Sequence, residues 1–323
     1  MHRLAQSLLA LLVAAPILGP TGCAWAGYPE RPVRIVVGFG AGSAADVASR
    51  IVGEELSQTM GQRFFIENKP GAGSNTAAAS VAKGEADGYT LFLGSVANTI
   101  SSSMKGSNVD LKNDLKPIAL LCSLPNILVV HPSVKAATVQ ELIALAKAEP
   151  GKLNYGSAGV GTSLHLSAEL FKSMAGIHMV HVPYTGSPQA MQDLIAGRLD
   201  MMFSPASTAL PQIEGGNLRA IAWSSIIRGR SLPDLPTVAE SGLPGFDTSI
   251  WFGLLAPVGT PDAIRDQLAE AIARALKSEG VIHAFRTQEM EPLHGGPAAF
   301  AKYIVDETAK WADVATKAGL TKP

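Results

Sequence analysis

Cysteine is scarce in this chain. Only Cys23 and Cys122 occur among 323 residues, and Cys23 lies in an N-terminal segment that we expect to be removed. A lone Cys122 cannot form an internal disulfide. Its setting, Ala119-Leu120-Leu121-Cys122, predicts a small buried hydrophobe instead of a nucleophile. The fold must therefore depend on its hydrophobic core, for which 47% hydrophobic residues are ample.

Charge is also sparse. Charged residues make up 16% of the chain, the formal net charge is −1, and no block of like charge occurs. A nucleic-acid interface needs a clustered basic face, so we expect no nucleic-acid partner. A small anionic ligand is still compatible with this composition, because backbone N–H groups supply positive potential without Lys or Arg.

Long apolar runs are missing apart from one at the N-terminus. Leu8–Leu18 is too short to span a bilayer but suits the core of a signal peptide, and Ala24–Ala26 supplies a small-x-small cleavage site. We expect residues 1–26 to be a signal peptide and the chain to be exported to the periplasm. The alternative is a lipoprotein anchored at Cys23.

Strand-like and helix-like segments alternate along most of the chain, which predicts an α/β fold with mostly parallel sheets. In the first half we expect strands at 34–37, 63–67, 90–93, 117–121 and 127–131, and helices at 46–60, 75–82, 97–104 and 138–148. In the second half we expect strands at 153–155, 178–182, 199–203, 219–223 and 249–255, and helices from 162, at 187–196, 205–214, 261–277, 281–286 and 297–318.

Glycine-rich loops join several of these strands to helices. The first, Gly38–Asp46, has a counterpart in Gly156–His165, and Asn68–Ser74 and Gly94–Asn98 are similar turns. Ligands of open α/β sheets bind beyond the carboxyl ends of the strands, and a helix N-terminus attracts an anion. We therefore expect two opposed helix N-termini to form an anion site.

The chain is expected to fold into two lobes. The tail helices need a sheet to cover, and the first lobe has free faces. We predict that lobe 1 combines residues 27–130 with 250–323, that lobe 2 spans 131–249, and that the ligand cleft lies between them.

Two enzymatic readings compete with a binding function. Gly40–Ala45 fits G-x-G-x-x-A, and Glu67 follows where a dinucleotide site would hold a ribose. Alternatively, Ser157 or Ser163 could pair with His165 in a hydrolase, although no third group is evident. We expect no cofactor.

Three further side chains are candidates for binding or structure. Asp46 either caps its helix or contacts a ligand. Tyr184, in a turn after a strand, could pack over a ligand. His178 and His181 should project to opposite faces of a strand, so we expect no metal pair there.

Several short motifs, in order along the chain, carry a resemblance to a known family: Tyr28-Pro29 with Pro32–Val37, Asp46–Arg50, Glu67–Gly73, Ala86–Leu91, Asn154–Gly159, Thr162 with His165-Leu166, and Val182–Tyr184. From about Tyr28 to the C-terminus the sequence resembles the Bug-type periplasmic solute-binding receptors of tripartite tricarboxylate transporters. The resemblance implies a two-lobed periplasmic binding protein of type II-like architecture. It would close on a small organic mono- or dicarboxylate, pass it to membrane transporter subunits and catalyse no reaction; we expect a monomer.

The resemblance also implies contact residues. Carried over to this sequence, they are Phe39, Ala41, Gly42, Ser43 and Asp46 in one lobe, with Ala72 and Asn98 nearby, and Ser157, Gly159, Thr162 and His165 in the other. One departure concerns Ala44-Ala45, which stand where the family commonly has Gly or Pro followed by Thr. A hydroxyl contact to the ligand is therefore expected to be lost.

Overall fold

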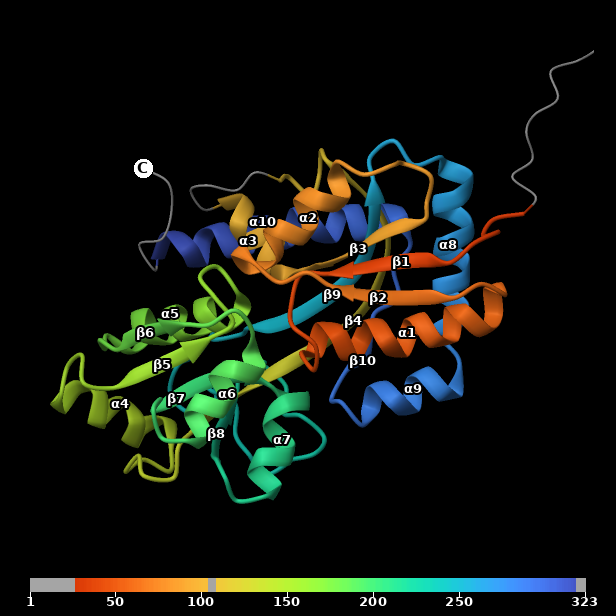
Figure 1. Ribbon diagram of the computed structural model, residues 1–323. Coiled ribbons are helices and arrows are strands. Elements are labelled where there is room, and N and C mark those ends of the chain that lie inside the picture. Colours follow the sequence, from red (N-terminus) through yellow and green to blue (C-terminus); the bar gives the residue numbers. More distant parts are fainter. Residues whose placement is uncertain (1–26, 104–108, 318–323) are drawn as a thin grey trace, which may run out of the picture.

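The computed structural model describes residues 27–103 and 109–317 (Figure 1). The expected signal peptide, Cys23 and the predicted helix ends at Met104 and Ala318 lie outside these ranges.

The elements follow the predicted alternation. The strands are β1 (Val33–Val37), β2 (Phe64–Asn68), β3 (Thr90–Ser95), β4 (Leu115–Val130), β5 (Asn154–Ser157), β6 (Val180–Pro183), β7 (Met201–Pro205), β8 (Arg219–Trp223), β9 (Ser249–Pro257) and β10 (Glu291–Pro292). The helices are α1 (Ala44–Met60), η1 (Ala72–Ser74), α2 (Asn75–Ala82), α3 (Val96–Ser103), α4 (Val139–Ala148), α5 (Ser163–Ala175), α6 (Ser187–Ile195), α7 (Ala206–Glu214), α8 (Asp262–Ala275), α9 (Glu279–Arg286) and α10 (Pro297–Lys317).

One mixed sheet runs through the molecule in the order β2-β1-β3-β9-β4-β7-β5-β6, with β10 and β8 also paired to β4. Pairing is parallel among β2, β1 and β3 at one end and among β7, β5 and β6 at the other. The middle strands β3, β9, β4 and β7 pair antiparallel. The two parallel ends form two lobes, each covered by helices (Figure 1).

The long strand β4 joins the two lobes and corrects one prediction. The sequence indicated two separate strands, at 117–121 and 127–131. In the structure they are one 16-residue strand. Pro125 is the last residue of β4 paired with β9, and Asn126 is the first paired with β7. A proline lacks the N–H of a regular ladder, so it is accommodated where the strand exchanges partners.

The tail helices pack mainly on the sheet and helices of the first lobe. Helix α8 packs on α1 and β4, α9 packs on α1, and α10 packs on α3 and β4. Other element bounds agree with the predictions to within about two residues, the usual uncertainty of helix and strand ends. The lobe bounds 27–130 with 250–323 and 131–249 stay a prediction.

Large buried side chains fill the core of both lobes. Trp251 on β9 packs edge-on against Phe300 of α10, and Phe203 on β7 packs against Phe171 of α5. Burying side chains of this size contributes roughly 2–3 kcal/mol each. Cys122 is free and fully buried, as predicted. This packing fixes the strand ends from which the cleft loops project.

Candidate functional site

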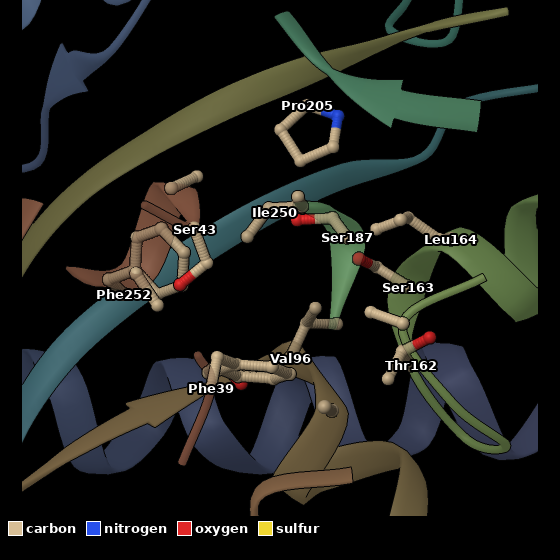
Figure 2. A pocket seen from close by; sticks show the side chains of 15 residues that line it. Phe39, Ser43, Val96, Thr162, Ser163, Leu164, Ser187, Pro205, Ile250 and Phe252 are labelled. Carbon is tan, nitrogen blue, oxygen red and sulfur yellow. The ribbon is translucent and has the colours of Figure 1, made fainter. Parts of the chain in front are cut away.

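A cavity lies between the two lobes, and we call it the cleft cavity (Figure 2). Fifteen residues line it, and none carries a charged side chain. The first lobe and β9 contribute Phe39, Ser43, Ala44, Ala45, Ser95, Val96, Ala97, Ile250 and Phe252, and the second lobe contributes Ala158, Thr162, Ser163, Leu164, Ser187 and Pro205.

The cleft cavity is narrow because loops of the two lobes meet around it. A Cβ built on Gly73 would lie 3.2 Å from the carbonyl oxygen of Val160, and one built on Gly186 would lie 3.8 Å from the backbone nitrogen of Gly40. About 40 Å³ of the cavity is open to the centres of water molecules. One enclosed water needs about 10–15 Å³ on that measure, so only a small ligand fits without the lobes moving apart.

A second cavity adjoins the first, and we call it the loop cavity. It shares Phe39 and Ala158 with the cleft cavity and offers about 190 Å³ on the same measure. Its other lining residues are Gly38, Gly71, Ala72, Gly73, Ser74, Gly159, Val160, Tyr184 and Thr185.

Helix N-termini converge on the cleft cavity. The residues that line it include the first residues or N-caps of α1, α3, α5, α6 and α7. The first N–H groups of a helix have no partner within that helix, and the helix dipole places positive potential there. The cavity therefore attracts an anion although no cationic side chain lines it.

Side chains at the start of α1 accept hydrogen bonds from the backbone N–H groups of its first turn and of the loop before it. Ser43 is the N-cap, and its hydroxyl accepts a hydrogen bond from the Asp46 N–H. The Asp46 carboxylate accepts hydrogen bonds from the Gly42 N–H at 3.0 Å, from Arg50 at 2.8 and 3.0 Å, and from Asn68 at 2.9 Å. Helix α1 thus begins two residues before the predicted start, and Asp46 stabilises its first turn from within.

The same contacts keep Asp46 ionised. Burial on its own would raise the pKa of this carboxyl group, but the hydrogen bonds from Arg50, Gly42 and Asn68 outweigh burial and lower the pKa below its usual value. Its negative charge offsets the positive end of the α1 dipole. Because Arg50 pairs with that carboxylate at 2.8 Å, the pair as a whole adds little net charge at the α1 terminus.

We expect Asp46→Asn to lower the free energy of unfolding by about 2 kcal/mol, because charge-assisted hydrogen bonds to a buried carboxylate are lost. Urea titration at pH 7 measures this loss. Asp266→Asn is the matched control, since Asp266 pairs with Arg265 at a half-exposed surface site and should change stability by less than about 0.5 kcal/mol. Equal losses in the two variants would contradict a structural role for Asp46.

The N-terminus of α5 differs from that of α1. Its N-cap Thr162 makes no capping hydrogen bond, and the Thr162 hydroxyl instead donates to the Gly159 carbonyl at 2.8 Å. The hydroxyls of Ser163 and Ser187 point toward the middle of the cleft cavity (Figure 2), and neither has a partner among the described residues. These hydroxyls and the uncapped N–H groups are available to an anion.

A pair of stacked histidines contacts the loop that precedes α5, Gly156–Thr162, which we call the α5 loop. The rings of His165 on α5 and His181 on β6 lie 4.2 Å apart between centroids. The Gly161 N–H donates to Nδ1 of His165 at 3.3 Å, and Nε2 of His181 is 2.7 Å from the Ser157 hydroxyl. The two histidines therefore hold both ends of the loop that precedes α5.

Burial keeps both histidines neutral. It lowers the pKa of His165 to about 4, with His181 as a further cause, and it lowers the pKa of His181 to about 4. The charged groups that face the pair are Glu169 and Lys172 of α5, which are 2.6 Å apart. Tyr155 of β5 stacks on His181 and donates its hydroxyl to Glu169.

The sequence matches the family described as "Tripartite tricarboxylate transporter family receptor" over residues 48–320. The chain belongs to this receptor family. Among curated relatives, BugT of Bordetella pertussis is 34% identical over 310 residues, covering 95% of this chain and 93% of BugT. A UPF0065 protein in the tcbD-tcbE intergenic region of Pseudomonas sp. strain P51 is 34% identical over 286 residues, covering 88% of this chain and 85% of that protein.

Solved structures confirm the two-lobed receptor architecture. The R. palustris protein Rpa4515 with adipate is 35% identical, with a TM-score of 0.88, and covers 91% of this receptor and 99% of that chain. The periplasmic binding protein BugD is 31% identical, with a TM-score of 0.87 and coverages of 92% and 100%. MatC from Rhodopseudomonas palustris with bound malate is 30% identical, with a TM-score of 0.85 and coverages of 89% and 99%.

The predicted contact residues of the receptor fall into two groups. Phe39, Ser43 and Thr162 line the cleft cavity, and Phe39, Ala72, Gly159 and Tyr184 line the loop cavity. The others, which line neither cavity, are Ala41, Gly42, Asp46, Asn98, Ser157 and His165. Apart from the exposed Ala41, these residues hydrogen-bond to nearby loop or helix-start residues.

Sequence reasoning missed part of the lining. Ile250 and Phe252 alternate along β9 and face the cavity from a strand more than 200 residues beyond Phe39. Ser187 follows a strand and starts a helix, which is the pattern used for the other loops and could have identified it. For His181 the sequence predicted only that it forms no metal pair with His178, and it did not reveal that parallel pairing places His181 beside Tyr155.

The hydrolase pairing has an unexpected geometry. The imidazole beside Ser157 is His181, not His165, and Ser157 is fully buried. Glu67, which the dinucleotide reading assigned to a ribose, pairs with Arg34 at 2.9 Å. Among the described residues no group of three or more His, Cys, Asp or Glu could hold a metal ion. None of the helices in the described ranges is long and apolar enough to cross a bilayer.

Proposed function

We propose that this receptor is a periplasmic monomer that captures a small organic mono- or dicarboxylate between its lobes and delivers it to the membrane subunits of a tripartite transporter. The observation that carries this function is the cleft cavity, where helix N-termini from both lobes converge without a charged side chain. Related receptors with adipate and with malate support the ligand class.

The α5 terminus is the proposed carboxylate site. Its uncapped N–H groups and the Ser163 and Ser187 hydroxyls can each donate to a carboxylate oxygen. Gly42, Asp46, Ser157 and His165 would then act by holding the loops and not by touching the ligand. Binding requires the lobes to part and close again, as in hinge-type binding proteins.

A thermal-shift panel tests the proposal. Hexanoate, adipate, malate, citrate and uncharged hexan-1-ol would each be added to the purified chain at pH 7. A carboxylate at 100 times its Kd stabilises the folded state by about 2.7 kcal/mol, which raises the melting temperature by several degrees. A panel in which no carboxylate shifts melting, or in which hexan-1-ol shifts it equally, contradicts the proposal.

Single-residue variants locate the carboxylate. We expect Ser163→Ala to weaken binding of every active carboxylate by about tenfold, because a hydrogen bond to a charged group is lost. Ser173→Ala on the exposed side of the same helix is the matched control and should leave affinity unchanged. Calorimetric titration measures both. Unchanged affinity of the Ser163→Ala variant would show that the carboxylate does not bind at the start of α5.

A further inference from the structure

Strands β4 and β9 carry another cavity on the face that points away from the cleft, and we call it the hinge groove. Ile250 and Phe252 of β9 line the cleft cavity, so the residues that alternate with them face the other side of the sheet. One of these is Ser249, which pairs with Pro125 of β4 and lines the hinge groove together with it. The hinge groove therefore lies behind the cleft, where β4 passes from one lobe to the other.

A loop of the second lobe covers the hinge groove. We call residues 225–231, which follow β8, the strap, and all but the last of them line the groove. At one end of the strap the Ser224 hydroxyl donates to the Thr248 carbonyl, and at the other end the Trp223 indole N–H donates to the Leu232 carbonyl at 3.1 Å. Both ends of the strap are thus anchored to the second lobe.

The strap is also bound to the first lobe, through Glu289. This residue follows α9, which packs on α1 and β10. The Glu289 carboxylate accepts hydrogen bonds from the Arg230 N–H at 3.1 Å, from the Ser231 N–H at 2.8 Å and from the Ser231 hydroxyl. The Arg230 guanidinium pairs with Glu291 of β10. These four contacts, which we call the tether, join the two lobes behind the ribbon of β4 and β9.

Glu289 occupies a backbone position that favours glycine. The Glu289 N–H donates to the Arg286 carbonyl and the Met290 N–H donates to the Phe285 carbonyl, which is a turn that commonly ends a helix with a left-handed glycine. The φ of Glu289 is +54°, and only 4% of the residue is exposed. A strained backbone and a buried carboxylate both persist only where the surrounding contacts outweigh their cost. For this carboxylate, those contacts are the hydrogen bonds to the strap.

Resting on the proposed function, we infer that Glu289 is a positioning residue that restricts the motion of the lobes and thereby sets ligand affinity. Two-stranded ribbons twist more strongly than broad sheets, so the ribbon of β4 and β9 by itself permits the lobes to rotate about its axis. The tether lies off this axis and opposes the rotation. Opening the cleft bends the ribbon toward the hinge groove, where about 460 Å³ is open to the centres of water molecules and accommodates the bend.

Two substitutions of Glu289 test its effect on affinity. Glu289→Gln keeps the shape of the side chain, and Glu289→Gly suits the left-handed turn, so at least the second should fold, as melting curves will show. By calorimetric titration at pH 7, both variants should bind hexanoate and adipate about fivefold more weakly, because fewer unliganded molecules have the lobes aligned. Glu240→Gln is the matched control, since its carboxylate accepts from Arg228 and the Thr237 N–H within the second lobe. Its affinity should be unchanged.

Distances between spin labels measure the motion itself, which a merely stabilising role of Glu289 would not alter. Cys23→Ser and the burial of Cys122 restrict labelling to introduced cysteines. Exposed sites are Gln58 on α1, paired in turn with Lys147 on α4 and with Ser173 on α5. Without ligand, both variants should broaden at least one of the two distance distributions, and the control variant should broaden neither.

Distributions as narrow in both Glu289 variants as in the unchanged chain overturn the inference and leave the carboxylate receptor intact. Broader distributions with unchanged affinity for both compounds also overturn it, because the tether would then not set binding. If no carboxylate binds even the unchanged chain, the proposed function fails, and the distance distributions still decide whether Glu289 restricts the lobes.

Discussion

Replacing Gly38 by alanine should lower the free energy of unfolding by about 3 kcal/mol, at the upper end of overpacking effects. A Cβ built on Gly38 would lie 2.0 Å from the Ser74 hydroxyl oxygen and 2.5 Å from the Ser74 Cα. The hydroxyl could rotate, but the backbone atom cannot move without shifting the turn before α2. Ser74 is fully buried and has a φ of +79°, so the turn has little freedom. Urea titration measures the loss.

The same variant should bind hexanoate at least about tenfold more weakly, because the shifted turn lines the loop cavity. Gly40→Ala is the matched control within the same loop. No atom lies within 4 Å of a Cβ built on Gly40, and its φ lies outside the left-handed range. Its stability and affinity should match those of the unchanged chain. If Gly38→Ala behaves like Gly40→Ala, the close contact with Ser74 does not constrain the cleft.

Lowering the pH from 7 to 4 should cost the folded state about 3 kcal/mol through His165 alone. The folded-state pKa of His165 is about 4, whereas an unfolded chain protonates histidine near 6.5. The unfolded state therefore binds the proton first as the pH falls. The stabilisation is complete above about pH 6.5 and is lost as the pH approaches 4. His181, with a pKa of about 4, adds a loss of the same sign.

Two variants separate the contribution of the histidines to the pH dependence of stability from that of the carboxylates. The pKa values of Asp46 and Glu169 lie below their usual range, so these groups lose their stabilising contacts at lower pH than the histidines. His165→Gln should flatten the dependence of unfolding free energy on pH between 4 and 6.5, as measured by urea titration at several pH values. His178→Gln replaces an exposed histidine and should keep the original dependence. The same slope in both variants would contradict the assignment.

Local sequence signals predicted the loops of the site well. Glycines at the ends of β1 and β5, each followed by a helical pattern, predicted the loops on both sides of the cleft without information on long-range contacts. The start of α4 is likewise local: the Thr138 hydroxyl accepts a hydrogen bond from the Glu141 N–H, and the Glu141 carboxylate accepts one from the Ala137 N–H. These features depend on backbone geometry within a few residues and are therefore readable from the sequence.

The sequence did not show which of the candidate residues would line the cavities and which would hydrogen-bond to or stack on neighbouring residues. Asp46 was a candidate ligand contact, yet its carboxylate bonds with Asn68 on the next strand, 22 residues away. His165 was a candidate for the same role, yet it stacks on His181 through the pairing of β5 with β6. The apolar lining residues Ile250 and Phe252 of the cleft cavity were missed because they come from β9, whose place depends on the sheet order. Such contacts arise only from the complete topology.

The pairing of β4 with β9 limits how the two lobes can move. Both connections between the lobes pass through these strands, which are hydrogen-bonded side by side from Leu115–Pro257 to Pro125–Ser249. Two strands that are hydrogen-bonded along this length cannot slide past each other, but the two-stranded ribbon that they form can bend. We therefore expect opening to have a single mechanical degree of freedom. One distance measured across the cleft should then report the whole motion.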